Sequence, residues 1–308
     1  MRDVARARPA PPLDLPELLT SWELHLRAER KSPQTVKAYA DGVRAYLAWC
    51  ARVGRPAQVD RRQLREFVDD LLSGGSKPAT AVSRHLAVRR FSAWLAEEGE
   101  QALDPLLGLR APKLDKPVVE PLTDDQLRAL LKACRGSELR DKRDEAIVRL
   151  MFTSGARAGE VAALQVADLS LRLDPATVTI RRGKGGTGRV VPLAVEAAAA
   201  IDRYLRARRS HRLAAEPALW LGDRGKGFTY DALHKTLALR AQTAGVEGFH
   251  PHLLRHTAAH RWLARGGSEG GLMAVAGWTR PDMLLRYTKA RASARAAEEA
   301  RRLNLGEL

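Results

Sequence analysis

Four prolines interspersed with lysines between residues 104 and 121 constrain the fold of this chain more than any other feature. Proline lacks a backbone N–H and is disfavoured inside helices and central strands, so this stretch does not fit a regular element. We therefore predict an extended basic linker, and the 308 residues are long enough for a domain on each side of it. The expected organisation is a disordered basic tail at 1–13, a helical domain at 14–103, the linker at 104–121, and a larger domain at 122–308.

Before the linker, apolar residues recur at the spacing of amphipathic helices. Ser32 followed by Pro33 predicts a helix start, because serine caps free N–H groups and proline suits the first turn. We expect four helices, at 15–29, from Pro33 to Cys50, from Asp60 to Leu72, and at 79–97. The expected core residues of the fourth helix are Val82, Leu86, Phe91 and Leu95. The outer faces carry Arg44, Arg52, Arg61, Arg62, Arg84, Arg89 and Arg90.

After the linker, the pattern mixes helices with a short β segment. Thr123 and Gln126 have the spacing of a capping box, which predicts a helix running to about Cys134. The β-type runs 177–181 and 189–192 flank a glycine-rich basic loop and predict a hairpin. Further helices are expected at 141–153, from 156, at 194–213, at 230–244, from Pro251, at Leu272–Ala276 and at 291–303. The fold class is therefore mainly α, with a small β-hairpin or sheet in the second domain. The arginines of 194–213 fit either a solvated face or contacts with a DNA backbone.

The charge balance indicates the class of partner. The chain has 52 lysines and arginines against 36 acidic residues, a net charge of +16, which favours nucleic acid as the partner. Its two cysteines, Cys50 and Cys134, have neither disulfide-framework nor metal-site spacing. The N-terminus lacks the apolar core of a signal peptide, and no apolar run is long enough for a membrane span. We expect a cytoplasmic protein with no membrane partner.

The densest group of histidines and arginines lies at 250–261, which holds four of the eight histidines. Pro251 is placed to start a helix, in which His252 and Arg255 would share a face. A histidine beside an arginine is suited to holding an anion such as a phosphate. His252, His256 and His260 also share a face, but no fourth ligand lies at metal spacing, so we predict no metal site.

His252 and Arg255 belong to a set of five short motifs that are spread over the second half of the chain. They are Thr153–Glu160 with Arg157, Gly183-Lys184-Gly185, His252–Thr257 with Arg255, Gly277-Trp278, and Arg286-Tyr287-Thr288. In kind, order and spacing they resemble the tyrosine site-specific recombinases, also called the phage integrase family. Trp278 stands where many members have histidine. The N-terminal helices resemble the core-site-binding domain of that family, so the resemblance covers nearly the whole chain. The short N-terminal tail favours a simple Xer-like or mobile-element recombinase over an arm-dependent one.

The chemistry needed to cleave a phosphodiester without a metal matches these residues. Arginine guanidiniums are always charged and fork-shaped, so Arg157 and Arg255 are suited to clamp the non-bridging oxygens. The resemblance implies that Tyr287 is the nucleophile and forms a 3′-phosphotyrosyl link. An indole N–H can donate a hydrogen bond but cannot shuttle a proton, so we expect Trp278 to have a positioning role.

The remaining site residues have helper roles. The resemblance implies that His252 assists in acid–base chemistry and that Lys184 is the general acid for the leaving oxygen. Lys226, in Gly225-Lys226-Gly227, has similar surroundings, but Lys184 is favoured because it lies between two strand-like runs. Supporting roles are expected for Glu160, which would orient Arg157, and for His256.

The expected function is site-specific DNA recombination, whether for integration, excision or resolution, with no cofactor, metal or ATP. Two alternatives remain open: a catalytically inactive DNA-binding or regulatory protein of the same fold, and a type IB topoisomerase-like enzyme that relaxes DNA. The resemblance implies a double-stranded DNA recombination site as partner. It also implies a homo-tetramer on synapsed DNA and a monomer or weak oligomer when free, with the helix at 291–303 placed to dock on a neighbouring protomer.

Overall fold

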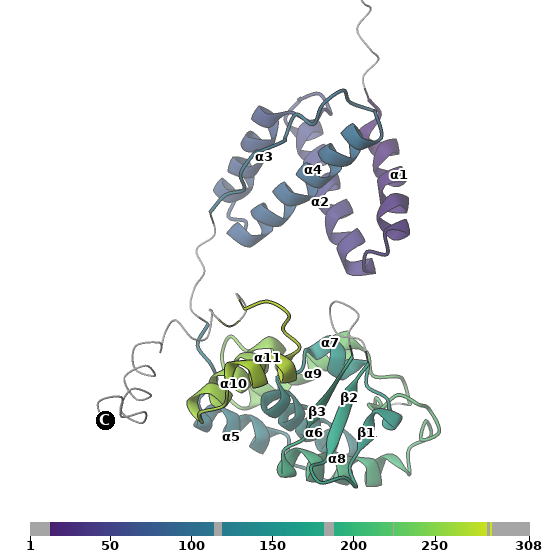
Figure 1. Ribbon diagram of the computed structural model, residues 1–308, viewed down its shortest axis with the longest axis vertical. Coiled ribbons are helices and arrows are strands. Elements are labelled where there is room, and N and C mark those ends of the chain that lie inside the picture. Colours follow the sequence, from purple (N-terminus) through teal and green to yellow (C-terminus); the bar gives the residue numbers. More distant parts are fainter. Residues whose placement is uncertain (1–12, 114–118, 182–187, 224, 282–283, 285–308) are drawn as a thin grey trace, which may run out of the picture. The chain divides into compact units, whose positions relative to one another are not determined.

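The computed structural model describes residues 13–113, 119–181, 188–223, 225–281 and 284. The chain forms two compact units, Met1–Pro117 and Val118–Leu308. The first unit is helical, and the second combines helices with a three-stranded antiparallel sheet. The expected fold class, mainly α with a small sheet in the second unit, is confirmed (Figure 1).

Four helices build the N-terminal unit: α1 Leu15–Ala28, α2 Pro33–Arg52, α3 Arg61–Ser73 and α4 Pro78–Glu97. Two of them begin at side-chain caps. Ser32 Oγ accepts a hydrogen bond from the Thr35 N–H at 3.2 Å, and Asp60 Oδ1 accepts from the Gln63 N–H at 2.9 Å. These caps satisfy N–H groups that have no partner within the helix, and they fix where α2 and α3 start.

The core of this unit forms where α2 packs closely on α4. A Cβ atom added to Gly42 would lie 2.5 Å from the Ala87 Cβ, so glycine at this position allows the two helix backbones to approach. Aromatic side chains fill the space on either side of this contact. The largest of those with under 2% exposure are Trp22, Tyr46, Phe67 and Phe91.

The buried face of α4 differs from the expected one. Phe91 and Leu95 are buried as predicted, but Leu86 is 38% exposed and Val82 is only half-buried. The expectation for Leu86 was wrong. His85 lies one position earlier on the helix, is 3% exposed and takes the core position instead.

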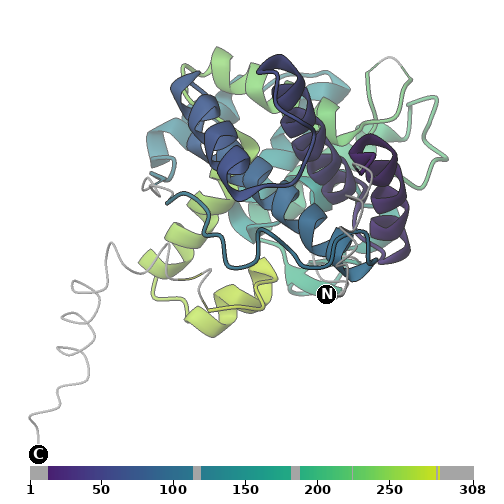
Figure 2. The same ribbon diagram turned by 90° about the horizontal axis from the view of Figure 1, so that it is seen from above.

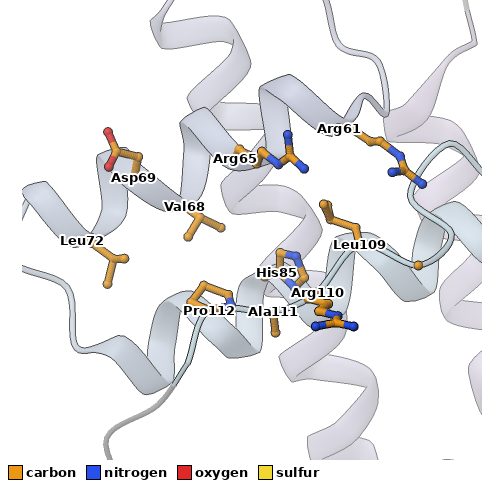
Figure 3. Close-up of a pocket in the computed structure, with 11 residues that line it drawn as sticks. Arg61, Arg65, Val68, Asp69, Leu72, His85, Leu109, Arg110, Ala111 and Pro112 are labelled. Atoms are coloured by element: carbon orange, nitrogen blue, oxygen red, sulfur yellow. The ribbon is translucent and has the colours of Figure 1, made fainter.

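A cavity of about 510 Å³ lies beside His85, between α3 and residues 108–112 (Figure 3). Arg61, Arg65 and Arg110 contribute to its lining. The His85 Nδ1 atom has no hydrogen-bond partner among the residues that the structure describes. Burial, with a smaller contribution from Arg89, lowers the pKa of His85.

The first part of the proline-rich segment packs on the N-terminal unit. Leu106 and Leu109 are buried in its core, and Arg61 Nε donates a hydrogen bond to the Pro105 carbonyl at 2.6 Å. This portion is therefore not a free linker, although the prolines do exclude regular structure as expected. Only residues 113–121 remain as a candidate connection, and 114–118 of these lie outside the described residues.

The second unit contains the sheet. Strand β1 is Leu169–Ser170, β2 is Thr177–Ile180 and β3 is Arg189–Pro192, in the antiparallel order β1-β2-β3. Val178 pairs with Val191 in the β2–β3 register, and both side chains are fully buried. The predicted hairpin is confirmed, whereas the two-residue strand β1 was not predicted. The glycine-rich tip at 182–187 lies outside the described residues.

The helices of the second unit pack against one another, and α11 (Glu269–Ala276) packs against strand β3 of the sheet. They are α5 Asp124–Ala133, α6 Leu139–Ser154, α7 Ala158–Ala162, α8 Val195–Arg208, α9 Tyr230–Thr243, α10 Pro251–Ala264 and α11 Glu269–Ala276, with a short 3-10 helix at Val166–Asp168. Helix α6 packs against both α8 and α10. Helix α10 also packs against α11, and these two are the yellow-green helices of Figure 2. The capping box at Thr123 and Gln126 is present as predicted. The expected helix at 291–303 lies outside the described residues.

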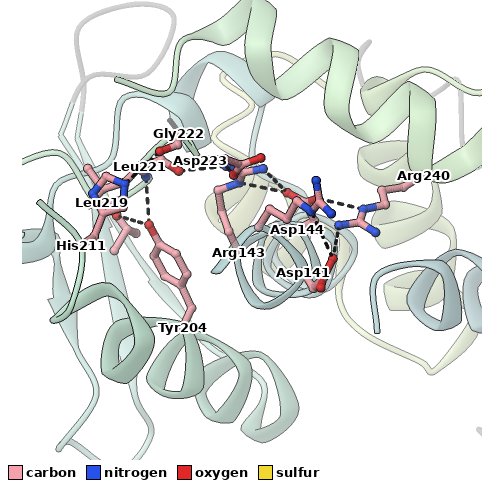
Figure 4. A network of polar contacts seen from close by, with 11 residues as sticks. Asp141, Arg143, Asp144, Tyr204, His211, Leu219, Leu221, Gly222, Asp223 and Arg240 are labelled. Atoms are coloured by element: carbon pink, nitrogen blue, oxygen red, sulfur yellow. Dashed lines mark hydrogen bonds and ion pairs between the residues drawn. The ribbon is translucent and has the colours of Figure 1, made fainter. Parts of the chain in front are cut away.

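A buried network of charges anchors α6 to its neighbours (Figure 4). Asp144, whose side chain is 2% exposed, accepts from Arg143 Nε at 2.9 Å and from Arg240 Nε on α9 at 2.8 Å. Arg240 also donates to Asp141 at 2.6 Å, and Arg143 to Asp223 at 3.0 Å. Because every one of these charges has an opposite charge beside it, the network fixes the position of α6 without leaving an unpaired buried ion.

Helix α8 ends at Arg208, five residues before the expected end. The Arg208 side chain folds back and donates to four backbone carbonyls, those of Ala214, Glu216, Ala218 and Leu219. Arg208 is only 6% exposed, so it belongs to the core rather than to a DNA-binding strip. No helix in the described part of the chain is long and apolar enough to cross a membrane.

Candidate active site

Arg157 follows a sharp break between two helices. Helix α6 ends at Gly155, whose φ of 64° lies in the left-handed region that favours glycine, and Arg157 then caps the short helix α7. Glu160, in α7, accepts hydrogen bonds from the Arg157 backbone N–H at 2.9 Å and from Arg157 Nη1 at 2.8 Å. The backbone and the guanidinium of Arg157 are thus held by one carboxylate.

Arg255 reaches the same break from α10. Its side chain is almost entirely buried, with the residue 2% exposed, and its Nη1 donates to the Gly155 carbonyl at 2.6 Å. The guanidinium carbon lies 5.2 Å from the centre of the Trp278 ring. A residue 100 positions away in sequence from Gly155 is therefore fixed beside the Arg157 turn.

The Gly277-Trp278 turn completes this arrangement. Helix α11 ends at Gly277 with a φ of 64°, and the Gly277 carbonyl accepts from Arg157 Nη2 at 3.4 Å. Trp278 is 5% exposed and packs in a small apolar cluster that includes Leu263 and Leu284. The structure therefore brings together Arg157, Arg255 and Trp278, three residues that the motifs predicted to share a site.

The histidines of α10 lie in different environments. His252 is exposed in the first turn, whereas His256 is 8% exposed, and the two rings meet edge to face at 4.8 Å. Burial, with a smaller contribution from His234, lowers the pKa of His250. Within the residues that the structure describes, no group of three metal-ligating side chains comes together.

Arg189, at the start of β3, is a site residue that the sequence motifs did not identify. Its Nη1 and Nη2 donate to Glu160 Oε1 and Oε2 at 3.1 and 2.7 Å, and its Nε donates to the Val275 carbonyl at 2.8 Å. Burial by itself raises the pKa of Glu160. The hydrogen bonds from Arg189 and from the Arg157 backbone outweigh this effect, so the pKa of Glu160 lies below its usual range. The only sequence signal was a basic residue at the start of a β-type run.

Two of the predicted site residues, Lys184 and Tyr287, lie outside the described residues. Lys184 falls in the segment between β2 and β3. Leu284, three positions before Tyr287, is 5% exposed and belongs to the cluster that contains Trp278. The alternative lysine, Lys226, is exposed in a loop where its carbonyl accepts from the Gly222 N–H at 2.9 Å.

The arrangement can hold an anion. Two guanidiniums with fixed orientation, backed by a buried carboxylate and an indole, form a site for negative charge that does not need to reorganise when the charge appears. Arginine forks match the oxygens of a phosphate geometrically. The described part of the site, which α7, α10 and the turn after α11 assemble, therefore has side chains suited to bind an anion with the shape of a phosphate.

Comparison with known proteins assigns the class. Residues 120–294 match the model of the phage integrase family, and residues 19–99 match that of the phage integrase N-terminal SAM-like domain. The chain belongs to the phage integrase family and is a tyrosine recombinase, an enzyme that transfers DNA strands. The resemblance seen in the sequence motifs is thereby confirmed.

The relatives place it within that family. The chain is similar to tyrosine recombinase XerC of Xanthomonas campestris, with 32% identity over 257 residues, which covers 82% of this chain and 78% of the relative. It is 34% identical to XerC of Chromobacterium violaceum over 253 residues, covering 82% of this chain and 81% of the relative.

Solved structures share the fold. One is the XerH site-specific recombinase bound to a palindromic difH substrate, with a TM-score of 0.71 and 19% identity, covering 86% of this chain and 79% of that chain. Another is a lambda integrase dimer bound to a COC′ core site, with a TM-score of 0.68 and 16% identity, covering 88% of this chain and 94% of that chain.

Proposed function

We propose that this chain cleaves and rejoins double-stranded DNA at a specific recombination site through a 3′-phosphotyrosyl intermediate on Tyr287. The observation that supports it most is the interlocking of the two arginines. Arg255 donates to the carbonyl before the Arg157 turn, and Arg157 contacts the carbonyl before Trp278. The two residues suited to clamp a phosphate are thus held in one place by contacts between distant parts of the chain.

The proposed reaction assigns a step to each residue. The Tyr287 hydroxyl oxygen attacks the phosphorus, while Arg157 and Arg255 bind the non-bridging oxygens, on which charge accumulates. The bond from phosphorus to the 5′ oxygen breaks, and Lys184 supplies the proton that this oxygen takes up. His252 acts as the base that takes up the proton of the Tyr287 hydroxyl. Attack by a 5′ hydroxyl on the phosphotyrosyl link reverses these proton transfers, releases Tyr287 and rejoins the strand.

Trp278 has a different task in this proposal. Its ring lies beneath the Arg255 guanidinium and is held by apolar neighbours, so it fixes the orientation of Arg255. Glu160 does the same for Arg157, through the hydrogen bonds described above. His256 meets the His252 ring edge to face and is placed to limit its rotation.

We further propose that four copies of the chain act on two DNA sites. One of the solved structures with the same fold is a lambda integrase tetramer bound to a Holliday junction, at 16% identity and a TM-score of 0.66. A monomer or weak oligomer would then assemble on DNA, with the segment at 291–303 docking on a neighbour. Because its XerC relatives are bacterial, we place this reaction on DNA in the bacterial cytoplasm.

A covalent trap tests the proposal. Duplexes selected from a random-sequence pool by binding to the full chain are prepared with a nick at successive positions, so that the leaving fragment diffuses away. The wild type should form a protein–DNA adduct that survives SDS, and Tyr287→Phe should form none. Tyr230→Phe is the matched control, because Tyr230 is an exposed tyrosine of the same unit, and it should retain the adduct. A wild type that gives no adduct at any nick position would contradict the proposal.

A further inference from the structure

Arg189 connects strand β3 to α7, which carries Glu160, and to α11, which leads into Trp278. It begins β3, a strand that packs against α11 (Figure 1), and its side chain is 11% exposed. Through Glu160 it contacts α7, and through the Val275 carbonyl it contacts the last turn of α11. One guanidinium therefore joins the strand after the hairpin tip to the Arg157 turn and to the segment that leads into Trp278.

The charges around Glu160 do not cancel in pairs. Arg157 and Arg189 both donate to the same carboxylate, whose side chain is 5% exposed. If Glu160 had Arg157 as its one cationic partner, that pair would be neutral, and a phosphate bound by Arg157 would meet a carboxylate a few ångströms behind it. With Arg189 bonded to both carboxylate oxygens, the cluster of three keeps a positive charge.

We propose that Arg189 is a positioning residue of the cleavage reaction that neutralises Glu160, so that the charge of Arg157 is retained for the scissile phosphate. It also holds the Gly277 turn in place. This inference rests on the proposed role of Arg157 as a phosphate ligand. If Arg189 were purely structural, its replacement would affect folding, but its effect on the cleavage rate would not depend on the charge of Glu160. This difference can be measured.

The experiment measures the single-turnover rate of adduct formation on the nicked duplex described above. Arg189→Met should lower this rate by about 10²–10³-fold, the range seen when one transition-state electrostatic contact is lost. The Kd for DNA should stay within about threefold, because a nearly buried side chain adds little to the exposed basic surface that dominates DNA affinity. Arg189→Lys keeps the charge but not the fork and should lie between the wild type and Arg189→Met.

Two readouts separate charge balance from structure. Removal of Arg189 takes away the largest of the contacts that lower the pKa of Glu160, so this pKa should rise, and acidification should protonate Glu160 more readily and remove the opposing charge. The deficit of Arg189→Met relative to the wild type should therefore shrink as the pH falls. Glu160→Gln removes that charge at all pH values, so in the Glu160→Gln background the Arg189→Met change should cost less than about tenfold.

The following results would contradict the proposed role of Arg189. A wild-type rate in Arg189→Met would overturn the inference, as would a deficit that is independent of pH and equally large in the Glu160→Gln background. If Arg189→Met does not fold, judged by circular dichroism and gel filtration, the same comparison is made with Arg189→Gln in both backgrounds, because glutamine also removes the charge but can still donate a hydrogen bond. A wild type without an adduct contradicts the proposed function, whereas an active wild type with an equally active Arg189→Met contradicts this inference alone.

Discussion

Replacing Gly277 with alanine should damage the site through Arg189. At a φ of 64° any residue with a Cβ is strained, by roughly 1–2 kcal/mol. The added Cβ would also lie 2.7 Å from Arg189 Nη1, so the guanidinium must move. Moving it breaks at least one hydrogen bond to Glu160, worth about 1.5–3 kcal/mol because the partners are charged. We expect Gly277→Ala to lose about 2.5–5 kcal/mol of unfolding free energy, the sum of the two effects.

Gly245 offers a matched control. Its φ is 69°, and a Cβ added there would meet no atom within 4 Å. Gly245→Ala should therefore have the backbone cost alone, about 1–2 kcal/mol. Urea unfolding followed by circular dichroism gives both free energies, and hydrogen exchange at β3 and α11 shows whether the loss lies at the site.

The cleavage rate gives a second comparison between these variants. A displaced Arg189 no longer holds the Arg157 turn, and a misplacement of about 1 Å at a reacting centre can cost about 10²-fold in rate. Gly277→Ala should show such a loss on the nicked duplex, whereas Gly245→Ala should cleave normally. Equal losses of stability in the two variants, together with equal cleavage rates, would refute the reasoning. The Arg189 guanidinium would then move away from the added Cβ without a cost in stability or rate.

Three further predictions concern the scaffold. Because burial lowers the pKa of His85, the stability that this residue contributes is full above about pH 6.5 and is lost as the pH falls through the lowered pKa. In urea titrations, His85→Leu should therefore flatten the loss of stability below about pH 6.5. Arg208→Met leaves buried carbonyls without their donor at about 1–3 kcal/mol each, and hydrogen exchange should show faster opening of residues 209–222. Leu86→Ala should change the unfolding free energy by under about 0.5 kcal/mol, whereas Leu95→Ala should cost about 2–5 kcal/mol; equal effects would mean that Leu86 is a core residue after all.

Local chemistry made much of the fold predictable. The caps at Ser32, Asp60 and Thr123 act within three residues, so the helix starts could be predicted from the sequence alone. Strands β2 and β3 follow one another in the sequence, pair antiparallel, and carry the β-type residues expected of a hairpin. In both cases the determining contacts are made between residues that lie near each other in the sequence.

Contacts between distant residues explain what could not be predicted. Leu86 was expected in the core because it is large and apolar, but α4 is oriented by its close approach to α2 at Gly42 and Ala87. Arg208 looked like one of several surface arginines, yet the carbonyls that bury it belong to a turn that only the folded chain forms. Neither contact leaves a periodic trace in the sequence.

The two clamp arginines show why motifs reveal some site residues and not others. The contacts that orient Arg255 include a backbone carbonyl and an indole ring. Arg157 is oriented by a carboxylate, which holds it and also cancels its charge. A second cation beside Glu160 is therefore needed to offset the negative charge of the carboxylate. The need for this cation comes from the charge balance around Glu160 and not from a direct part in the cleavage reaction. Arg189 meets this need from a strand whose sequence carries no catalytic motif, so its role follows from the folded geometry alone.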